Sequence, residues 1–158
     1  GELTVRRGVV AGYLPQARES ACHTAQGDAA TCPRGSETVL LVEDDEMVRT
    51  IAGRILRAAG YTVMEASNAA EALVAFEKTK TRLDLLVTDV VMPGMSGWEL
   101  VDLVRRKSPA TRVLLVSGYE AHQTLHARRA DRFLNFLPKP FSMNTLSEKV
   151  REVLDAAG

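Results

Sequence analysis

The chain has 158 residues, of which 46% are hydrophobic and 25% are charged, which is ordinary for one globular domain with room for an additional arm. Lysine plus arginine equal aspartate plus glutamate at 20 each, so the basic field typical of a protein that binds nucleic acid or an anionic membrane is absent. No apolar run approaches the ~20 residues that span a bilayer, and residues 1–20 lack the apolar core of a signal peptide. We therefore expect a cytoplasmic location, with no membrane contact by this segment and no nucleic-acid partner.

The chain divides near residue 36. Residues 1–35 show no sustained apolar period, and residues 21–35 are predicted to form a linker because they offer too little apolar surface to offset the entropy of ordering. Two cysteines, Cys22 and Cys32, lie in this arm. A disulfide between them is disfavoured in the cytosol, and with His23 they match no zinc module, so we interpret them as incidental.

Five apolar runs alternate with five helical patterns from Ser36 onward. The expected strands are Thr38–Val42, Tyr61–Ala66, Leu83–Asp89, Arg112–Ser117 and Phe133–Leu137. The expected helices run from about Met47 to a C-capping Gly60, from Asn68 to about Lys80, from Ser96 to Lys107, from Glu120 to Ala130, and from Ser142 through Leu154. Strands that are continuously apolar and alternate with helices indicate an α/β domain whose parallel sheet is covered on both faces.

Polar side chains follow four of these strands. Glu43 and Asp44 follow the first, Asp89 ends the third, Ser117 ends the fourth and Lys139 follows the fifth. In an open α/β sheet such residues meet at one edge, where ligands bind. Three clustered carboxylates repel one another unless a hard cation such as Mg²⁺ joins them, while an ammonium and a hydroxyl suit phosphoryl oxygens. Because a carboxylate can accept a phosphoryl group covalently, the pattern favours an aspartate that becomes phosphorylated.

Residues 36–158 resemble a response-regulator receiver domain of two-component signalling. The matching stretches are Leu40–Glu46, Thr88–Gly97, Val116–Tyr119 and Phe136–Phe141. The resemblance implies a flavodoxin-like (βα)5 fold, a doubly wound parallel sheet in the strand order 2-1-3-4-5, and a cis peptide bond before Pro140.

The resemblance also implies a role for each acidic residue. Asp89 would be the phosphoacceptor, and Mg²⁺ would be the cofactor. Asp44 would bind the metal directly, Glu43 would hold a metal-bound water, and the backbone carbonyl of Val91 would complete the protein ligands. The family usually carries aspartate at the position of Glu43, whose additional methylene changes its reach to the metal.

Three further positions would bind and report the phosphoryl group. Ser117 would bind one phosphoryl oxygen, and Lys139 would neutralise another while linking to unphosphorylated Asp89. On phosphorylation Ser117 would move inward and Phe136 would turn inward with it. The surface formed by the helix over 120–130, the fifth strand and the last helix would then change its affinity for a partner or for a second copy, as a population shift.

The implied partner is a kinase or phosphotransfer domain that carries phosphohistidine. Residues 9–18 resemble the last strand of a histidine-kinase ATP-binding domain, so residues 1–18 are interpreted as the end of such a domain, and the chain as the C-terminal receiver of a hybrid histidine kinase. The kinase's own histidine motif and lid glycines are missing. We therefore expect no enzyme activity beyond self-phosphotransfer and autodephosphorylation.

Three alternatives use the same residues differently. A pseudo-receiver would bind a partner without phosphorylation. A phosphatase with an aspartate nucleophile would carry a second aspartate two residues later, where Val91 stands. A flavin site is disfavoured because three carboxylates repel an FMN phosphate. His122 and His126, four residues apart, are interpreted as exposed surface rather than as metal ligands.

Overall fold

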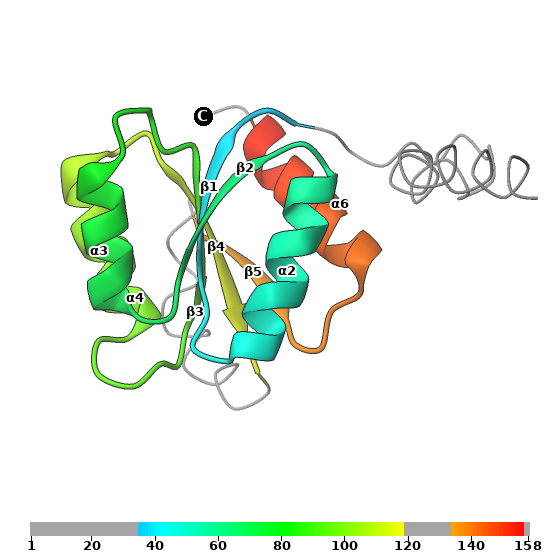
Figure 1. Ribbon diagram of the computed structural model, residues 1–158, viewed down its shortest axis with the longest axis horizontal. Coiled ribbons are helices and arrows are strands. Elements are labelled where there is room, and N and C mark those ends of the chain that lie inside the picture. Colours follow the sequence, from blue (N-terminus) through cyan, green and yellow to red (C-terminus); the bar gives the residue numbers. More distant parts are fainter. Residues whose placement is uncertain (1–34, 119–133, 157–158) are drawn as a thin grey trace, which may run out of the picture. The chain divides into compact units, whose positions relative to one another are not determined.

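The computed structural model describes residues 35–118 and 134–156. Its strands are β1 (Thr38–Val42), β2 (Thr62–Ala66), β3 (Leu85–Asp89), β4 (Arg112–Ser117) and β5 (Leu134–Pro138), and its helices are α2 (Glu46–Ala58), α3 (Ala69–Lys78), α4 (Gly97–Lys107) and α6 (Met143–Asp155). All four strand pairings are parallel and give the order β2-β1-β3-β4-β5, which confirms the predicted doubly wound sheet (Figure 1).

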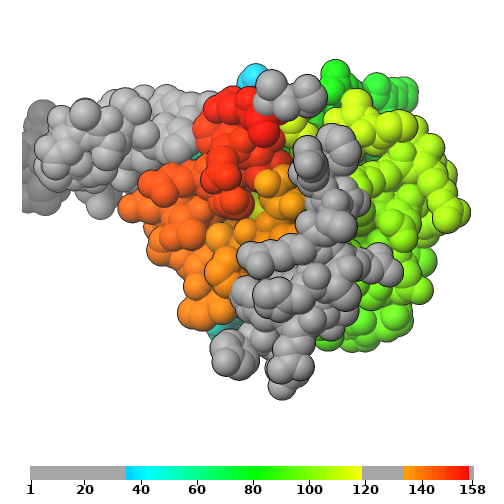
Figure 2. All heavy atoms as spheres, turned by 180° about the vertical axis from the view of Figure 1, so that it is seen from behind, coloured from blue at the N-terminus to red at the C-terminus, as the bar shows by residue number. Residues whose placement is uncertain are grey.

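The sheet separates two apolar cores, because side chains alternate between its faces along each strand. One core joins the strands to α2 and α6, and the other joins them to α3 and α4 (Figure 1). Seen from behind, α6 in orange to red and α4 in yellow-green lie on opposite sides of the molecule (Figure 2). The central strand β3 is buried along its whole length, so its last residue, Asp89, is held on a rigid support.

The predicted N-capping residues cap their helices as expected. Asn68 and Ser142 cap α3 and α6, and Ser96 forms a full capping box with Glu99 at the start of α4. Gly60 was predicted to be the C-cap of helix α2, but the cap is Ala59, and Gly60 lies one residue beyond it with a φ of 99°. A side chain at Gly60 would be strained by this φ and would press on the carbonyl oxygen of Gly35.

Element boundaries differ from prediction by one or two residues. Strand β2 begins at Thr62 because the Tyr61 amide still bonds to Leu56 O at the end of α2 (3.2 Å). Helix α3 ends at Lys78 because the next residue is extended, and β3 begins at Leu85, two residues after the buried Leu83. The arm over residues 1–34, the helix expected over 120–130 and Phe133 lie outside the described residues.

The amino edge of the sheet is closed by an ion-paired cluster, which we call the amino-edge cluster: Glu37, Tyr61, Arg151 and Asp155. The Arg151 guanidinium donates to both Glu37 oxygens (2.7 and 3.2 Å), to Asp155 (2.7 Å) and to the Tyr61 hydroxyl (3.4 Å). Hydrogen bonding from Arg151 holds the pKa of Glu37 below its ordinary value. This cluster joins the start of β1 to α6.

No helix within the described residues is both long and apolar enough to cross a membrane.

Candidate functional site

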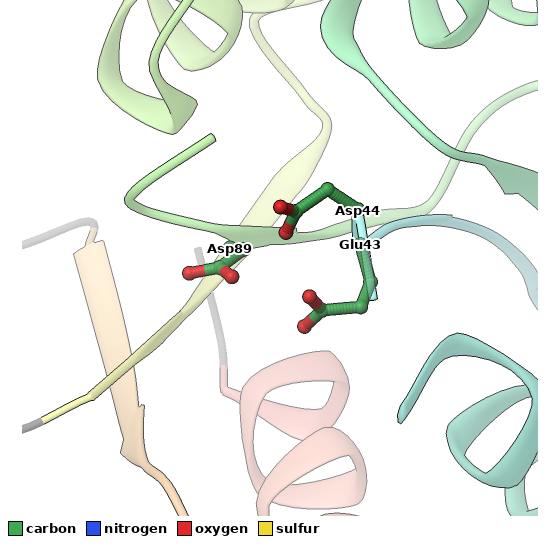
Figure 3. Close-up of side chains that lie close together, drawn as sticks. All are labelled: Glu43, Asp44 and Asp89. Atoms are coloured by element: carbon green, nitrogen blue, oxygen red, sulfur yellow. The ribbon is translucent and has the colours of Figure 1, made fainter. Parts of the chain in front are cut away.

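The carboxyl edge of the sheet gathers the polar residues that the sequence placed at strand ends. Glu43 and Asp44 follow β1, and Asp89 ends the neighbouring β3. Their three carboxylates lie close together, and one oxygen from each fits within a span of 4.8 Å (Figure 3). Glu43 and Asp89 are 3% and 7% exposed, whereas Asp44 is exposed. Like charges held this close in a partly buried site repel, so the arrangement favours a bound cation.

Among the described residues, Lys139 supplies the ammonium group that bonds to the carboxylates of this site. Its Nζ donates to Glu43 Oε2 at 2.6 Å and to Asp89 Oδ2 at 2.9 Å. The following peptide bond, Lys139–Pro140, is cis, as predicted, and the Lys139 amide bonds to Ser117 O at 2.8 Å. The hydrogen bond between the Lys139 amide and Ser117 O joins the loop after β5 to the end of β4, beside the carboxylates that Lys139 contacts.

Burial changes the protonation of this pair in a specific way. Desolvation raises the pKa of Glu43 to about 7, although the hydrogen bond from Lys139 acts against it. Burial alone would lower the pKa of Lys139, but its hydrogen bonds to Glu43 and Asp89 outweigh burial and raise the pKa. Lys139 therefore stays charged, while Glu43 takes up a proton more readily than an exposed glutamate does.

Asp45, the next residue after Asp44, has a structural role as the N-cap of α2. Its Oδ1 accepts hydrogen bonds from the amides of Met47 (2.9 Å) and Val48 (3.1 Å), so it caps α2. Its own amide donates to Glu43 Oε1 at 3.1 Å. Asp45 therefore serves as the N-cap of α2, whereas Asp44, which is exposed as well, makes none of these capping bonds among the described hydrogen bonds.

Ser117 lies at the end of β4, and its hydroxyl is buried. The residue is 1% exposed, and its Oγ has no hydrogen-bond partner in the part of the chain that the structure describes. Thr88, buried in the neighbouring strand, differs because its hydroxyl bonds to Asp89 O at 3.0 Å. A buried hydroxyl without a partner costs free energy of about 1–3 kcal/mol. Such a group at a strand end suits a ligand oxygen.

The loop after β3 approaches Asp89 from the other side. The Val91 amide donates to Asp89 Oδ1 at 3.3 Å, while the Val91 side chain is 67% exposed. Gly97, the first residue of α4, donates to Val90 O at 3.0 Å, and a Cβ at Gly97 would overlap the backbone of Asp89. Glycine therefore allows the start of α4 to lie directly against the Asp89 turn.

Phe136, the predicted switch residue, lies on β5 and is partly buried. Its ring contacts Trp98 of α4 with centroids 5.8 Å apart and planes tilted by 58°. This places an aromatic pair, of a geometry that aromatic rings favour, at the core on the α4 side of the sheet.

The structure also contains contacts that the sequence reasoning missed. The ion pair between Lys139 and Glu43 was not expected, because Glu43 was assigned to a metal-bound water alone. Arg49 was not singled out, yet its Nη1 donates to the backbone oxygen of Glu43 at 2.8 Å. Its place in the first turns of the helix that follows the acidic strand end is the only sequence signal for this contact.

The fold and the site together define a class: a five-stranded parallel α/β domain in the order 2-1-3-4-5, with a cluster of carboxylates and a lysine at its carboxyl edge. The response regulator receiver domain profile matches residues 39–151. The chain belongs to this family, which confirms the resemblance read from the sequence motifs.

Known proteins of two kinds are similar to the chain. A sensor kinase CckA from Brucella abortus is 42% identical over 128 residues, which is 81% of this chain and 14% of that protein. The response regulator receiver protein CpdR of the same organism is 32% identical over 75% of this chain and 98% of its own length. The chain therefore spans only a small part of the larger relatives that it matches, including 31% of a cyclic di-GMP phosphodiesterase from Thermotoga maritima.

Solved structures agree with the fold. The receiver domain of hybrid histidine kinase CckA is 36% identical with a TM-score of 0.64, and the match covers 75% of this chain and 99% of that one. The chemotaxis response regulator CheY4 of Vibrio cholerae is 30% identical with a TM-score of 0.65, again over 75% and 99%.

Proposed function

We propose that this domain accepts a phosphoryl group on Asp89 from phosphohistidine in a two-component phosphorelay. The observation that carries the proposal is the set around Asp89: two further carboxylates within 4.8 Å, the Lys139 ammonium at 2.9 Å, and the buried hydroxyl of Ser117 without a protein partner. These are the groups that phosphoryl transfer needs for positioning and charge neutralisation.

The proposed chemistry balances as two displacements at phosphorus. In the first, an Asp89 carboxylate oxygen attacks phosphorus, the P–N bond to the donor histidine breaks, and its electron pair returns to the imidazole, which takes up a proton. In the second, water attacks the acyl phosphate, the P–O bond to Asp89 breaks, and inorganic phosphate leaves with the carboxylate restored. Lys139 and Ser117 would hold phosphoryl oxygens in both steps.

The donor set fits Mg²⁺. Exposed Asp44 would bind the ion, with Asp89 and the Val91 carbonyl as the other protein ligands and Glu43 holding a bound water, and the cation would neutralise phosphoryl charge. Oxygen ligands alone, few in number and open to water on the Asp44 side, are what Mg²⁺ prefers. In this role Glu43, which already accepts a hydrogen bond from Lys139, would also accept one from the metal-bound water.

A surface beside the site supports the proposed partner. Val48, Ile51, Lys139, Pro140 and Phe141 line an apolar hollow of about 420 Å³. Ile51 is 51% exposed, although it follows the apolar period of α2. Since Lys139 belongs both to the hollow and to the phosphorylation site, a helix that docks here would present its histidine to Asp89. We propose a histidine kinase or phosphotransfer domain as this occupant.

The remaining parts of the proposal concern context and output. We propose that the domain acts in the cytoplasm, that its parent is a hybrid histidine kinase, and that residues 1–35 form the arm before the receiver. We further propose that Ser117 and Phe136 respond to phosphorylation and change the face formed by residues 120–130, β5 and α6. A homodimer through this face and the absence of a nucleic-acid partner remain predictions.

Phosphorylation by a small donor tests the proposal. The chain is incubated with acetyl phosphate and Mg²⁺, and its intact mass is measured. We expect the mass of one added phosphoryl group on the wild type, none on Asp89→Asn, and none when EDTA replaces Mg²⁺. A wild type that gains no mass would favour the pseudo-receiver, and catalytic turnover of external phosphate esters would favour the phosphatase.

The docking surface has its own test. Ile51→Asp places a charge in the hollow without touching the carboxylates, and Val74→Asp is the matched control because Val74 is similarly exposed (48%) on α3. With an autophosphorylated histidine kinase as donor, we expect transfer to Ile51→Asp to slow at least about tenfold. Transfer to Val74→Asp, and transfer to both variants from acetyl phosphate, should stay at the wild-type rate. Equal rates for both variants with the kinase would rule out this docking surface.

A further inference from the structure

Arg49 lies on α2 and reaches back to the turn that carries the acidic pair. Its Nη1 donates to the backbone oxygen of Glu43 at 2.8 Å, and its side chain is only 18% exposed. Glu43 is the first residue after β1, and its amide already bonds to Ala66 O at the end of β2 (3.1 Å). A carbonyl that leaves a strand end needs a donor, and here a side chain supplies it.

This bond fixes the orientation of the turn rather than of a single side chain. The peptide unit that Arg49 holds is the one that joins Glu43 to Asp44, so it sets where both carboxylates leave the backbone. The Glu43 side chain is held from two sides, by the Asp45 amide at 3.1 Å and by Lys139 at 2.6 Å. The Asp44 carboxylate is exposed, so its position depends mainly on the backbone.

The guanidinium of Arg49 also forms an ion pair with Glu65 of β2. Its Nε lies 4.0 Å from Glu65 Oε2 on β2, and the Glu65 carboxylate lies so close to α2 that a Cβ at Gly53 would overlap it. Arg57 shares the same Glu65 partner, at 2.6 Å, and also donates to Val63 O at 3.2 Å. Arg57, however, is half exposed and makes no contact with Glu43 among the described hydrogen bonds, so the chain contains its own control.

We propose that Arg49 is a positioning residue for the metal and phosphorylation site: through the Glu43 carbonyl it orients the acidic turn so that Asp44 and Glu43 face Asp89. The proposal rests on the proposed function, because it concerns the same site. Groups that orient metal ligands through hydrogen bonds commonly affect metal affinity tenfold or more when they are removed.

The test compares Arg49→Gln with Arg57→Gln in the full chain. Mg²⁺ is titrated by calorimetry, and thermal unfolding in EDTA is recorded in parallel. We expect Arg49→Gln to weaken Mg²⁺ binding on the order of tenfold. Its half-saturating Mg²⁺ concentration for phosphorylation by acetyl phosphate should rise by the same factor, with the rate recovering when Mg²⁺ saturates. Arg57→Gln, which loses a half-exposed ion pair with Glu65 and a hydrogen bond to Val63 O, should change Mg²⁺ affinity by less than about twofold.

A third variant keeps the inference testable if Arg49→Gln does not fold. Arg49→Lys retains the charge but not the forked donor, and we expect an affinity about threefold below the wild type. Mg²⁺ affinities that are equal in the wild type, Arg49→Lys and Arg49→Gln, or equally weakened by Arg57→Gln, would overturn the role of Arg49. If the wild type itself neither binds Mg²⁺ nor becomes phosphorylated, the proposed function fails first, so the two failures can be told apart.

Discussion

The two edges of the sheet use their charges in opposite ways. At the amino edge, Arg151 meets two carboxylates and the Tyr61 hydroxyl, and both oxygens of Glu37 are bonded. At the carboxyl edge, three carboxylates lie together and only two of them, Glu43 and Asp89, bond to the Lys139 ammonium, while the buried Ser117 hydroxyl has no partner within the described residues. At the amino edge the charged side chains pair with one another and stabilise the fold, whereas at the carboxyl edge the carboxylates and the Ser117 hydroxyl are placed to bind a ligand.

The largest effect is expected at the carboxyl edge, from Lys139→Met. Removing the ammonium should slow phosphorylation by acetyl phosphate about 100-fold, because a donor to the developing phosphoryl charge is lost. It should also tighten Mg²⁺ binding, since one positive charge no longer competes with the cation. Stopped-flow kinetics and calorimetry measure the two effects. Lys107→Met, which removes only the exposed pair with Glu77, is the control, and weaker Mg²⁺ binding in Lys139→Met would contradict this account.

At the amino edge, Arg151→Met should affect stability and not chemistry. The variant leaves Glu37 without its guanidinium partner, and we expect the free energy of unfolding to fall by about 2 kcal/mol in urea titrations. Lys149→Met on the same helix, which loses one exposed bond to Glu152 (3.0 Å), should change it by less than about 0.5 kcal/mol. The phosphorylation rate of Arg151→Met should equal that of the wild type. A clearly lower rate would mean that the two edges do not act separately.

The contrast repeats on a smaller scale between Asp44 and Asp45. Asp45→Ala removes the cap of α2 and should lower the free energy of unfolding by about 1 kcal/mol. Asp44→Asn should leave stability nearly unchanged in EDTA but abolish measurable Mg²⁺ binding. Urea unfolding and calorimetry on both variants check this exchange of roles, and an equal stability loss in the two would refute it.

The two edges should also differ in the sign of their pH dependence. Arg151 lowers the pKa of Glu37, so the stability that Glu37 contributes is present above its unfolded value near 4.5 and is lost as the pH falls. Burial raises the pKa of Glu43 to about 7, so the folded state binds a proton that the unfolded state lacks between pH 4.5 and 7, and stability falls as the pH rises through that range.

Single substitutions separate these two slopes in metal-free protein. Glu37→Gln should flatten the loss of stability on the acid side, and Glu43→Gln should flatten the loss between pH 4.5 and 7. The free energy of unfolding in EDTA, measured in steps from pH 4 to 8, gives both slopes. Changes of the same sign in the two variants would show that burial does not govern Glu43.

The sequence predicted the carboxyl edge better than the amino edge, for a physical reason. Strand ends and helix caps are local patterns, so the positions of Asp89, Ser117 and the capping Ser96 followed from neighbouring residues. The bond between Arg151 and Glu37 joins residues 114 apart, which no local pattern indicates. The same limit explains why the contact of Lys139 with Glu43, 96 residues apart, was missed although both residues were singled out.

The solvent exposure of apolar side chains on α2 could also not be predicted from the sequence pattern. Met47 and Ile51 follow the apolar period that predicted α2, yet they are 73% and 51% exposed because only the later residues of the period, such as Ile55 and Leu56, face the sheet. A helical period shows that residues share a face, but not how far along the helix that face is covered. The exposed apolar residues in the first half of α2 are the observation that suggests a docking surface.

The central claim is that the unsatisfied groups of the carboxyl edge exist to hold a phosphoryl group on Asp89. The most direct measurement is to phosphorylate the chain with acetyl phosphate and Mg²⁺, reduce it with borohydride, which converts an aspartyl phosphate to homoserine, and sequence the peptides by mass spectrometry. The account predicts homoserine at position 89 alone. Homoserine at Asp44 or elsewhere, or an unmodified Asp89 in a chain that has gained a phosphoryl group, would contradict it.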